Sequence, residues 1–150
     1  MDKKIKVAIA ADHAGYKLKK QLIDYLVSVR KLNVRDLGTN STESVDYPDF
    51  GHSLAREIEL GQSDMGISIC GSGNGINMTA NKHQGIRSAL CWTEEIARLA
   101  RAHNDANICA LPGRFLEVEE AIVIVDKFLS TDFEGGRHER RKQKIALKPF

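Results

Sequence analysis

A cysteine followed by a glycine-rich loop is the strongest chemical signal in the sequence. Residues 69–76 read Ile-Cys-Gly-Ser-Gly-Asn-Gly-Ile, with three glycines at alternate positions after an apolar run. Such a loop leaves backbone N–H groups free to bind an anion. The loop does not match the known nucleotide-binding motifs. Ile76 replaces the third glycine of the dinucleotide-binding motif G-x-G-x-x-G, and the Gly-Lys-Ser/Thr of a Walker A loop is not present. The pattern predicts an anion hole with the Cys70 thiol, a base or nucleophile, at its edge. The alternative is a tight turn beside an inert, buried cysteine.

A carboxylate and an imidazole follow the first apolar run of the chain. Residues 12–15 read Asp-His-Ala-Gly and come directly after the apolar residues 6–11. If the run is a strand, Asp12 and His13 lie at its carboxyl end, where α/β proteins bind their ligands. The alternative is that Asp12 only caps the helix that follows, which is a common role for aspartate.

The third candidate is a basic segment near the end of the chain. Arg137 and Arg141 are one helical turn apart, so their guanidinium groups share a face and could bind a phosphate. Six of the chain's Lys and Arg residues lie in residues 137–150 against one Glu, whereas the whole chain carries only +2. The local charge indicates an anion site. A nucleic-acid-binding segment is disfavoured because no aromatic residues interleave with these cations before Phe150. The alternative is a solvated basic helix.

The histidines give a weaker signal. His103 and Asn104 follow a helical pattern and precede the fifth strand, where they could cap the helix, with Asn104 in a left-handed turn. No pair of histidines has the spacing i, i+4, and no cysteine accompanies them, so we expect no metal site. The five histidines are His13, His52, His83, His103 and His138.

Composition sets the class of protein. A chain of 150 residues with 42% hydrophobic and 28% charged residues predicts one globular domain over residues 1–150. The sequence shows no leader peptide and no apolar run long enough for a membrane span, so we expect no membrane partner. Cys70, Cys91 and Cys109 are odd in number and widely spaced, which favours free thiols and a cytoplasmic location.

Alternating strand and helix patterns must position these residues. The pattern predicts strands at 6–11, 65–70, 86–91 and 107–111, and a further strand at 33–37 that Gly38 ends. Helical patterns separate them at 16–29, 48–61, 74–81, 93–102 and 117–129, and a basic helix runs from 137 towards 147. Continuous apolar strands, each followed by a helix, predict a doubly wound, Rossmann/flavodoxin-like three-layer α/β sandwich with a five-stranded parallel sheet and a basic C-terminal helix.

Taken together, the motifs resemble a known family. They are residues 12–15, Asp46-Tyr47-Pro48, residues 70–75, Ala80-Asn81-Lys82, residues 103–107 and Gly135-Gly136-Arg137-His138. In this order they closely resemble the type B ribose-5-phosphate isomerases, whose superfamily includes galactose-6-phosphate isomerase subunits and allose-6-phosphate isomerases. The resemblance covers nearly the whole chain and is more specific for the superfamily than for the substrate.

The resemblance implies a role for each matching position. Cys70 would be the base that moves a proton between C2 of the aldose and C1 of the ketose, since Ile76 stands where some relatives use a glutamate. His103 would open the furanose ring, and the loop amides with the Ser72 hydroxyl would bind the enediolate oxygen. The substrate contacts would be Asp12, His13, Tyr47, Gly71, Ser72, Gly73, Asn74, Gly75 and Asn104, with Arg114, Arg137, His138 and Arg141 at the phosphate.

The implied reaction interconverts ribose 5-phosphate and ribulose 5-phosphate. It needs a base and a stabilised oxyanion, and it requires neither a metal nor a redox cofactor if amides hold the enediolate. One alternative is a hexose 6-phosphate isomerase that acts on allose or galactose phosphate. An alternative of another class is a non-enzymatic nucleotide- or anion-binding domain on the same scaffold.

Topology predicts that the site is shared between chains. Cys70 ends the third strand, whereas His103 precedes the fifth, so the two lie at opposite edges of the sheet. A strand of five residues spans roughly 17 Å. We therefore expect a homodimer, possibly within a higher oligomer, in which each chain completes the active site of the other.

Overall fold

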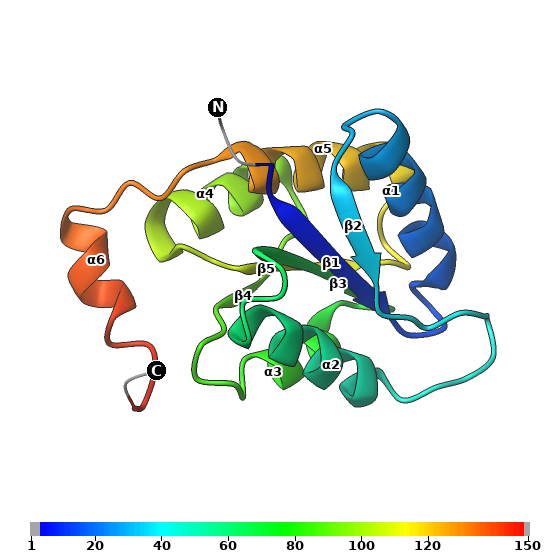
Figure 1. Cartoon of the computed structure of the whole chain (residues 1–150), viewed down its shortest axis with the longest axis horizontal. Helices are drawn as coiled ribbons and strands as arrows, with labels where there is room; N and C mark the ends of the chain where they lie inside the picture. The colour runs from blue at the N-terminus through cyan, green and yellow to red at the C-terminus, as the bar shows by residue number, and fades with distance from the viewer. Residues whose placement is uncertain (1–3, 149–150) are drawn as a thin grey trace.

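The computed structural model describes residues 4–148 and contains one parallel sheet between two helical layers (Figure 1). The five strands lie in the order β2-β1-β3-β5-β4, and every neighbouring pair is parallel. The strands are β1 (Lys6–Ala11), β2 (Asn33–Asp36), β3 (Met65–Cys70), β4 (Ser88–Leu90) and β5 (Ile108–Pro112). The predicted doubly wound α/β fold class is confirmed.

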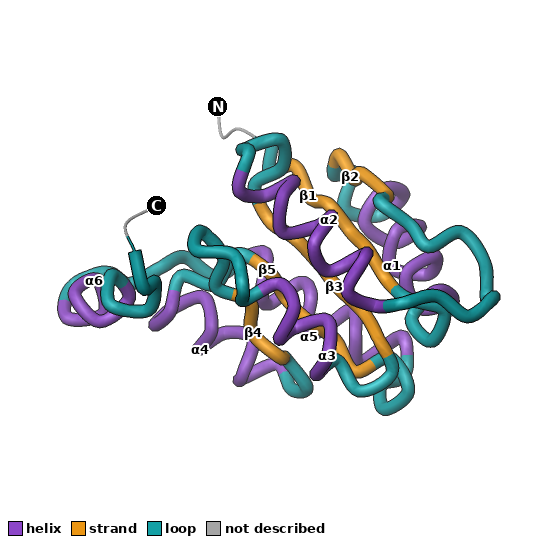
Figure 2. Tube along the Cα trace, turned by 90° about the horizontal axis from the view of Figure 1, so that it is seen from below, coloured by secondary structure: helices purple, strands orange, loops and turns teal. Residues whose placement is uncertain are grey.

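The direction in which the chain crosses the sheet decides where each helix lies. The chain moves one way along the sheet from β1 to β2 and from β4 to β5, and the opposite way from β2 to β3 and from β3 to β4. Right-handed crossovers therefore place α1 (Tyr16–Ser28) and α4 (Glu94–Asn104) on one face, and α2 (Tyr47–Glu59) and α3 (Asn74–Ala80) on the other (Figure 2). The helix α5 (Val118–Ser130) joins the first face.

Both faces of the strands are apolar because both are covered. On β1, Val7 and Ile9 pack into the core formed with α1, α4 and α5, whereas Ala8 and Ala10 pack against α2. All four side chains are fully buried. This two-sided burial explains why the strands read as continuous apolar runs instead of alternating patterns.

The last helix lies outside the sandwich. The helix α6 (Arg137–Lys142) contacts α4 and projects beyond the edge of the sheet (Figure 1). It is shorter than the helix predicted to run towards residue 147. The N–H groups of Lys144 and Ile145 donate to the carbonyls three residues earlier, instead of the four residues of an α-helix. Among the helices of residues 4–148, none combines the length and the apolar character needed to cross a membrane.

Three strands also differ from the prediction at their ends, β2 by a single residue at Asp36. The edge strand β4 begins at Ser88 instead of residue 86, because the Ile86 N–H closes a turn with the His83 carbonyl. The strand β5 extends to Pro112, which pairs with Cys70. The order of the last two strands differs from the 2-1-3-4-5 order of flavodoxin-like sheets. The topological switch point between β1 and β3, where the crossovers reverse direction, is unaffected.

A buried lysine fixes the helix that follows β1. Lys19 is 1% exposed, and its Nζ lies 2.6 Å from the Asp36 Oδ1 at the end of β2. The same carboxylate oxygen accepts the Gly38 N–H at 2.9 Å. The Asp36 side chain is 41% exposed, so water screens this pair in part and its loss would cost less than that of a fully buried pair. The pair holds α1 and the end of β2 together.

Candidate active site

Cys70 lies at the carboxyl end of the central strand. Its side chain is 4% exposed, and the carbonyls around it bind the loops of both neighbouring strands. The Ile69 carbonyl accepts the Asp12 N–H at 3.1 Å, and the Cys70 carbonyl accepts the Gly113 N–H at 2.9 Å. The ends of β1, β3 and β5 are thereby joined into one rigid edge around the thiol.

The loop after Cys70 needs its glycines. Gly73 has a φ of 77°, and a Cβ atom there would lie 2.4 Å from Leu90 Cδ1 and 3.0 Å from the Leu111 carbonyl carbon. Within residues 4–148, the N–H groups of Ser72 and Gly73 donate to no acceptor, and the exposed Ser72 hydroxyl accepts from the Asn74 N–H at 3.2 Å. The loop therefore offers two free amides beside the thiol, the geometry of an oxyanion hole.

The residues after β1 shape the wall of this edge. The Asp12 Oδ1 accepts the N–H groups of Ala14 and Gly15 at 2.9 and 3.2 Å, so the carboxylate stabilises its own turn before α1. The His13 Nδ1 accepts the Val45 N–H at 3.2 Å. A neutral imidazole that accepts at Nδ1 carries its proton at Nε2, so His13 offers a donor at this edge.

Arg114 and Tyr47 lie directly on the glycine loop. A Cβ atom on Gly71 would meet the Arg114 Nη1 at 3.0 Å, and one on Gly75 would meet the Tyr47 Cε2 at 2.6 Å. The Arg114 side chain is exposed and has no hydrogen bond or ion pair within residues 4–148. The loop is therefore flanked by a free guanidinium group on one side and by an aromatic ring on the other.

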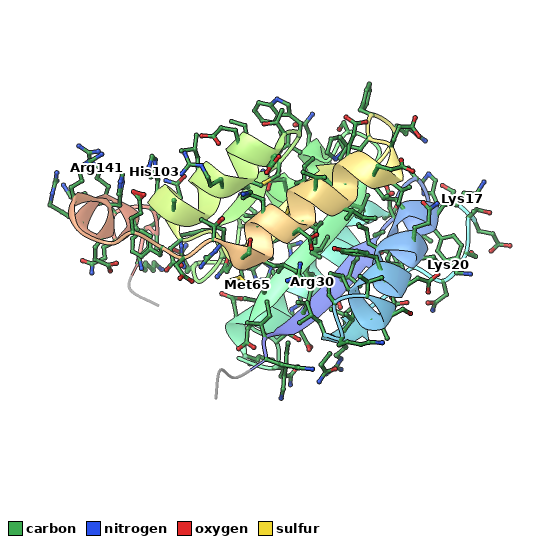
Figure 3. The ribbon with its side chains drawn as sticks, turned by 90° about the horizontal axis from the view of Figure 1, so that it is seen from above. Lys17, Lys20, Arg30, Met65, His103 and Arg141 are labelled. Atoms are coloured by element: carbon green, nitrogen blue, oxygen red, sulfur yellow. The ribbon has the colours of Figure 1, made fainter. Side chains whose placement is uncertain are left out.

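A second cluster of polar side chains forms where α4 meets α6. The rings of His103 and His138 are stacked, with centroids 4.2 Å apart and planes 12° from parallel. The Glu134 Oε1 lies 3.6 Å from the His103 Nε2 and 3.7 Å from the His138 Nε2. Figure 3 shows His103 and Arg141 together at this end of the molecule. The cluster combines two imidazoles, one carboxylate and the arginines of α6.

The sequence did not predict the grouping of His103, Glu134 and His138. Their ligand atoms lie within 4.8 Å of one another, which makes a metal site conceivable. However, the rings are stacked with planes 12° from parallel, so their in-plane Nε2 lone pairs lie in two separate planes and do not converge on one ion. Burial, followed by His103 and the nearby Arg137, lowers the pKa of His138, which marks surroundings that disfavour a cation. The arrangement suits acid–base chemistry and anion binding better than metal binding.

The end of α4 corrects one detail of the prediction. The helix continues through His103 and Asn104, and the left-handed residue that ends it is Asp105, with a φ of 48°. His103 therefore belongs to the last helical turn and does not follow it. Asparagine and aspartate both tolerate the left-handed region, so sequence alone does not decide between Asn104 and Asp105.

The structure divides the predicted site residues into two groups. The carboxyl-edge group contains Asp12, His13, Tyr47, Arg114 and residues 70–75, and the α4–α6 group contains His103, Asn104, Arg137, His138 and Arg141. Cys70 ends β3, whereas the Gly66 N–H near the start of β3 binds the carbonyl of Asn107, three residues after Asn104. The rise of a strand from residue 66 to 70 corresponds to about 13 Å. The predicted phosphate contacts are therefore split within one chain, with Arg114 in the first group.

Sequence reasoning missed two carboxylates. Glu134 lies between the two histidines, and its N–H donates to the Ala102 carbonyl at 2.9 Å. Glu134 lies directly before the motif Gly135-Gly136-Arg137-His138, and this position was the one signal in the sequence that pointed to it. Asp105 binds cations from three parts of the chain, a role that no local pattern reveals.

Comparison with known proteins identifies the chain. The fold, with a thiol beside a free-amide loop at the carboxyl edge of its sheet, is that of an α/β enzyme. A family model described as Ribose/Galactose Isomerase matches residues 7–145. A probable ribose-5-phosphate isomerase B from Mycoplasma pneumoniae is 46% identical over 140 residues, which cover 93% of this chain and 91% of that protein.

Solved structures agree with the sequence match. A ribose 5-phosphate isomerase from Thermotoga maritima has a TM-score of 0.94 and 50% identity, covering 96% of this chain and 99% of that one. A ribose-5-phosphate isomerase B from Mycoplasma genitalium, with bound ribulose-5-phosphate, has a TM-score of 0.87 and 45% identity, and the match covers 93% of each chain. The chain belongs to the Ribose/Galactose Isomerase family.

Proposed function

We propose that this protein is a cytoplasmic aldose–ketose isomerase that interconverts ribose 5-phosphate and ribulose 5-phosphate, as a single domain over residues 1–150. The relatives from Mycoplasma pneumoniae and Thermotoga maritima are named ribose-5-phosphate isomerases, and the structure from Mycoplasma genitalium contains bound ribulose-5-phosphate. The observation that carries the proposal is the Cys70 thiol at the carboxyl end of β3, beside the free amides of Ser72 and Gly73. A base next to an oxyanion hole is what proton transfer beside a carbonyl requires.

The reaction assigns separate tasks to these groups. His103 takes the proton of the anomeric hydroxyl at C1 and protonates the ring oxygen, which gives the open-chain aldose. The deprotonated sulfur of Cys70 then removes the proton on C2, and the electron pair moves to form the enediolate between C1 and C2. The amides of Ser72 and Gly73 stabilise the negative charge on O1, the former carbonyl oxygen. The proton of the C2 hydroxyl moves to O1, and Cys70 returns its proton to C1, which gives ribulose 5-phosphate.

Phosphate binding provides the orientation. The exposed side chains of Arg114, Arg137 and Arg141 have no ion pair or hydrogen bond in the described part of the chain, residues 4–148, so their guanidinium groups are available to an anion. Guanidinium groups bind phosphate oxygens with two parallel hydrogen bonds. Binding of this non-reacting group holds the reacting carbons against Cys70.

The two groups of residues meet across a dimer. Within one chain, Cys70 and His103 are attached at opposite ends of β3 and β5, too far apart to act on one sugar. A two-fold dimer would place the α4–α6 group of one chain against the carboxyl-edge group of the other, twice, by symmetry. The free Arg114 of one chain would then join Arg137 and Arg141 of its partner at one phosphate.

Turnover of purified protein tests the proposal. Wild-type protein should convert ribose 5-phosphate faster than allose or galactose 6-phosphate, in the presence of EDTA. Cys70→Ala should lose about 10²–10⁴-fold in kcat while still binding substrate, because the base is gone. Cys91→Ala is the matched control, since Cys91 is a buried thiol in the core and should leave turnover unchanged. Full activity of Cys70→Ala would assign the base elsewhere, and activity that needs zinc or manganese would refute the metal-independent mechanism.

A further inference from the structure

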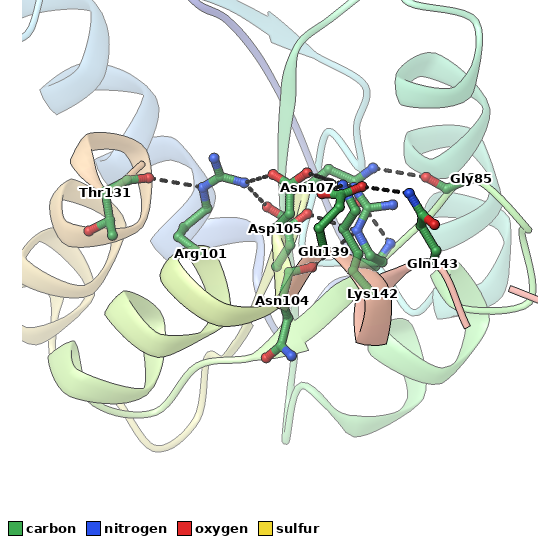
Figure 4. A network of polar contacts seen from close by, with 11 residues as sticks. Gly85, Arg101, Asn104, Asp105, Asn107, Thr131, Glu139, Lys142 and Gln143 are labelled. Atoms are coloured by element: carbon green, nitrogen blue, oxygen red, sulfur yellow. Dashed lines mark hydrogen bonds and ion pairs between the residues drawn. The ribbon is translucent and has the colours of Figure 1, made fainter. Parts of the chain in front are cut away.

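The carboxylate of Asp105 binds three cations from three parts of the chain (Figure 4). Its Oδ1 accepts from the Arg101 Nη1 at 2.9 Å. Its Oδ2 accepts from the Lys142 Nζ at 3.1 Å and lies 3.5 Å from the Arg87 Nη2. Arg101 belongs to α4, Lys142 to α6, and Arg87 directly precedes β4. One side chain therefore joins three elements immediately after the His103-Asn104 pair.

The same cations also hold the backbone of this turn. The Arg87 Nε donates to the carbonyls of Asp105 and Asn104 at 2.9 and 3.2 Å. The buried Arg101 extends the network to the far side, where its Nε donates to the Thr131 carbonyl at 3.2 Å. The last turn of α4 and the start of the segment leading to α6 are thus fixed to each other.

The contact with Lys142 anchors α6. This helix lies outside the sheet, and its main neighbour is α4 (Figure 1). The Lys142 Nζ also lies 3.1 Å from Glu139 within α6 and 4.8 Å from the centre of the Phe133 ring. Of these contacts, the one with Asp105 ties α6 to the end of α4. Arg137 and Arg141 are carried by the same six-residue helix, so their position depends on this anchor.

The balance of charge makes the carboxylate necessary. Burial opposes its ionisation, but hydrogen bonds from Lys142 and Arg101 lower the pKa of Asp105 below its ordinary value. The Arg101 and Lys142 side chains are 9% and 18% exposed, so water screens them only partly. Without the negative charge, three cations would face one another around the turn, and their repulsion would push α6 away from α4.

We propose that Asp105 is a positioning residue that holds His103 and the arginines of α6 as one preassembled half of the active site. It acts through Arg101, Arg87 and Lys142 and touches no substrate itself. The proposal rests on the proposed function, because it assumes that the α4–α6 group binds and opens a sugar phosphate. It adds that this half-site is assembled within each chain before the partner chain is bound.

Substitutions on both sides of the contact test the proposal. Asp105→Asn keeps the shape and tolerates the left-handed backbone, but removes the charge. Lys142→Met removes the partner and keeps the length of the side chain. Each should raise the KM for ribose 5-phosphate and the inhibition constant of inorganic phosphate ~10-fold, with a smaller change in kcat. The double variant should be no worse than Asp105→Asn alone, because Asp105→Asn already removes the contact with Lys142.

Glu139→Gln is the matched control. It removes the other carboxylate near Lys142, but this one lies within α6 and does not join it to α4. Its KM should equal that of the wild type. Hydrogen exchange gives a readout independent of activity: the amide protons of Gln143 and Lys144, which bond within this helical segment, should exchange faster in Asp105→Asn than in Glu139→Gln.

Several outcomes would overturn the proposal. A folded Asp105→Asn variant with the KM and the amide exchange of the wild type would overturn it. So would a double variant whose increase in KM equals the product of the two single increases. If Asp105→Asn does not fold, Lys142→Met alone must show the raised KM and the faster exchange, or the proposal fails. If wild-type protein does not turn over ribose 5-phosphate, the proposed function fails, whereas phosphate affinity and amide exchange still decide the role of Asp105.

Discussion

Complementation between two inactive variants tests the shared active site. Cys70→Ala removes the base from the carboxyl-edge group, and His103→Ala removes the ring-opening group from the α4–α6 group. Cys70 lies about 13 Å along β3 from Gly66, whose N–H binds the Asn107 carbonyl four residues after His103. Proton transfer needs heavy atoms within about 2.6–3.2 Å. We therefore expect both residues to reach one substrate only when they come from different chains.

The expected recovery follows from counting sites. In a mixed dimer, one site lacks both groups and the other has intact Cys70 and His103. Random pairing makes about half of the dimers mixed, and each has one working site of two, so about a quarter of the wild-type activity should return. Each parent should retain at most about 1% of wild-type turnover, since loss of a general acid–base group costs about 10²-fold or more. The recovered activity would therefore stand well above the background.

The assay is turnover of ribose 5-phosphate after the variants are unfolded and refolded together. Native mass spectrometry of chains with tags of different mass measures the fraction of mixed dimers. The control mixes Cys70→Ala with a Cys70→Ala/His103→Ala chain, whose mixed dimers contain no intact site. If mixed dimers of the two single variants form and activity stays at the background, the shared-site reasoning is wrong.

Two further predictions concern the α4–α6 group. Arg137→Ala and Arg141→Ala should each raise the KM for ribose 5-phosphate ~10-fold or more, because each removes a charge-assisted contact to phosphate; an equal loss with an unphosphorylated sugar would contradict this role. Burial, then His103 and Arg137, lower the pKa of His138 below its ordinary value of 6.5, so the unfolded chain binds the proton more tightly. The free energy of unfolding should therefore fall as the pH drops below that value, and His138→Gln should reduce this slope. Urea unfolding at about pH 7.5 and about pH 5.5 measures it, and equal slopes in both proteins would refute the assignment.

Much of the fold and part of the site could be predicted from the sequence. Continuous apolar runs separated by helical patterns specify parallel strands covered on both faces, because nearly every residue of the central strands β1, β3 and β5 is buried. The glycine loop after Cys70 is also a local property, since Gly73 has a positive φ that glycine adopts without strain. The Thr93 cap of α4 is local too, since its hydroxyl accepts the N–H of Ile96, three residues later.

Other features depend on contacts between distant residues, which no local pattern encodes. Lys19 lies in an amphipathic helix and resembles a solvent-exposed lysine, yet Asp36, seventeen positions away, makes its burial possible. Glu134 and Asp105 acquire their roles only when α6 folds back onto α4. The separation of Arg114 from Arg137 and Arg141 likewise follows from the sheet, because strand direction assigns each loop to one edge. The sequence alone determined which chemical groups this protein has and which strand each group follows. The tertiary structure decided which of them meet, because burial, charge pairing and strand direction act between residues that are distant along the chain.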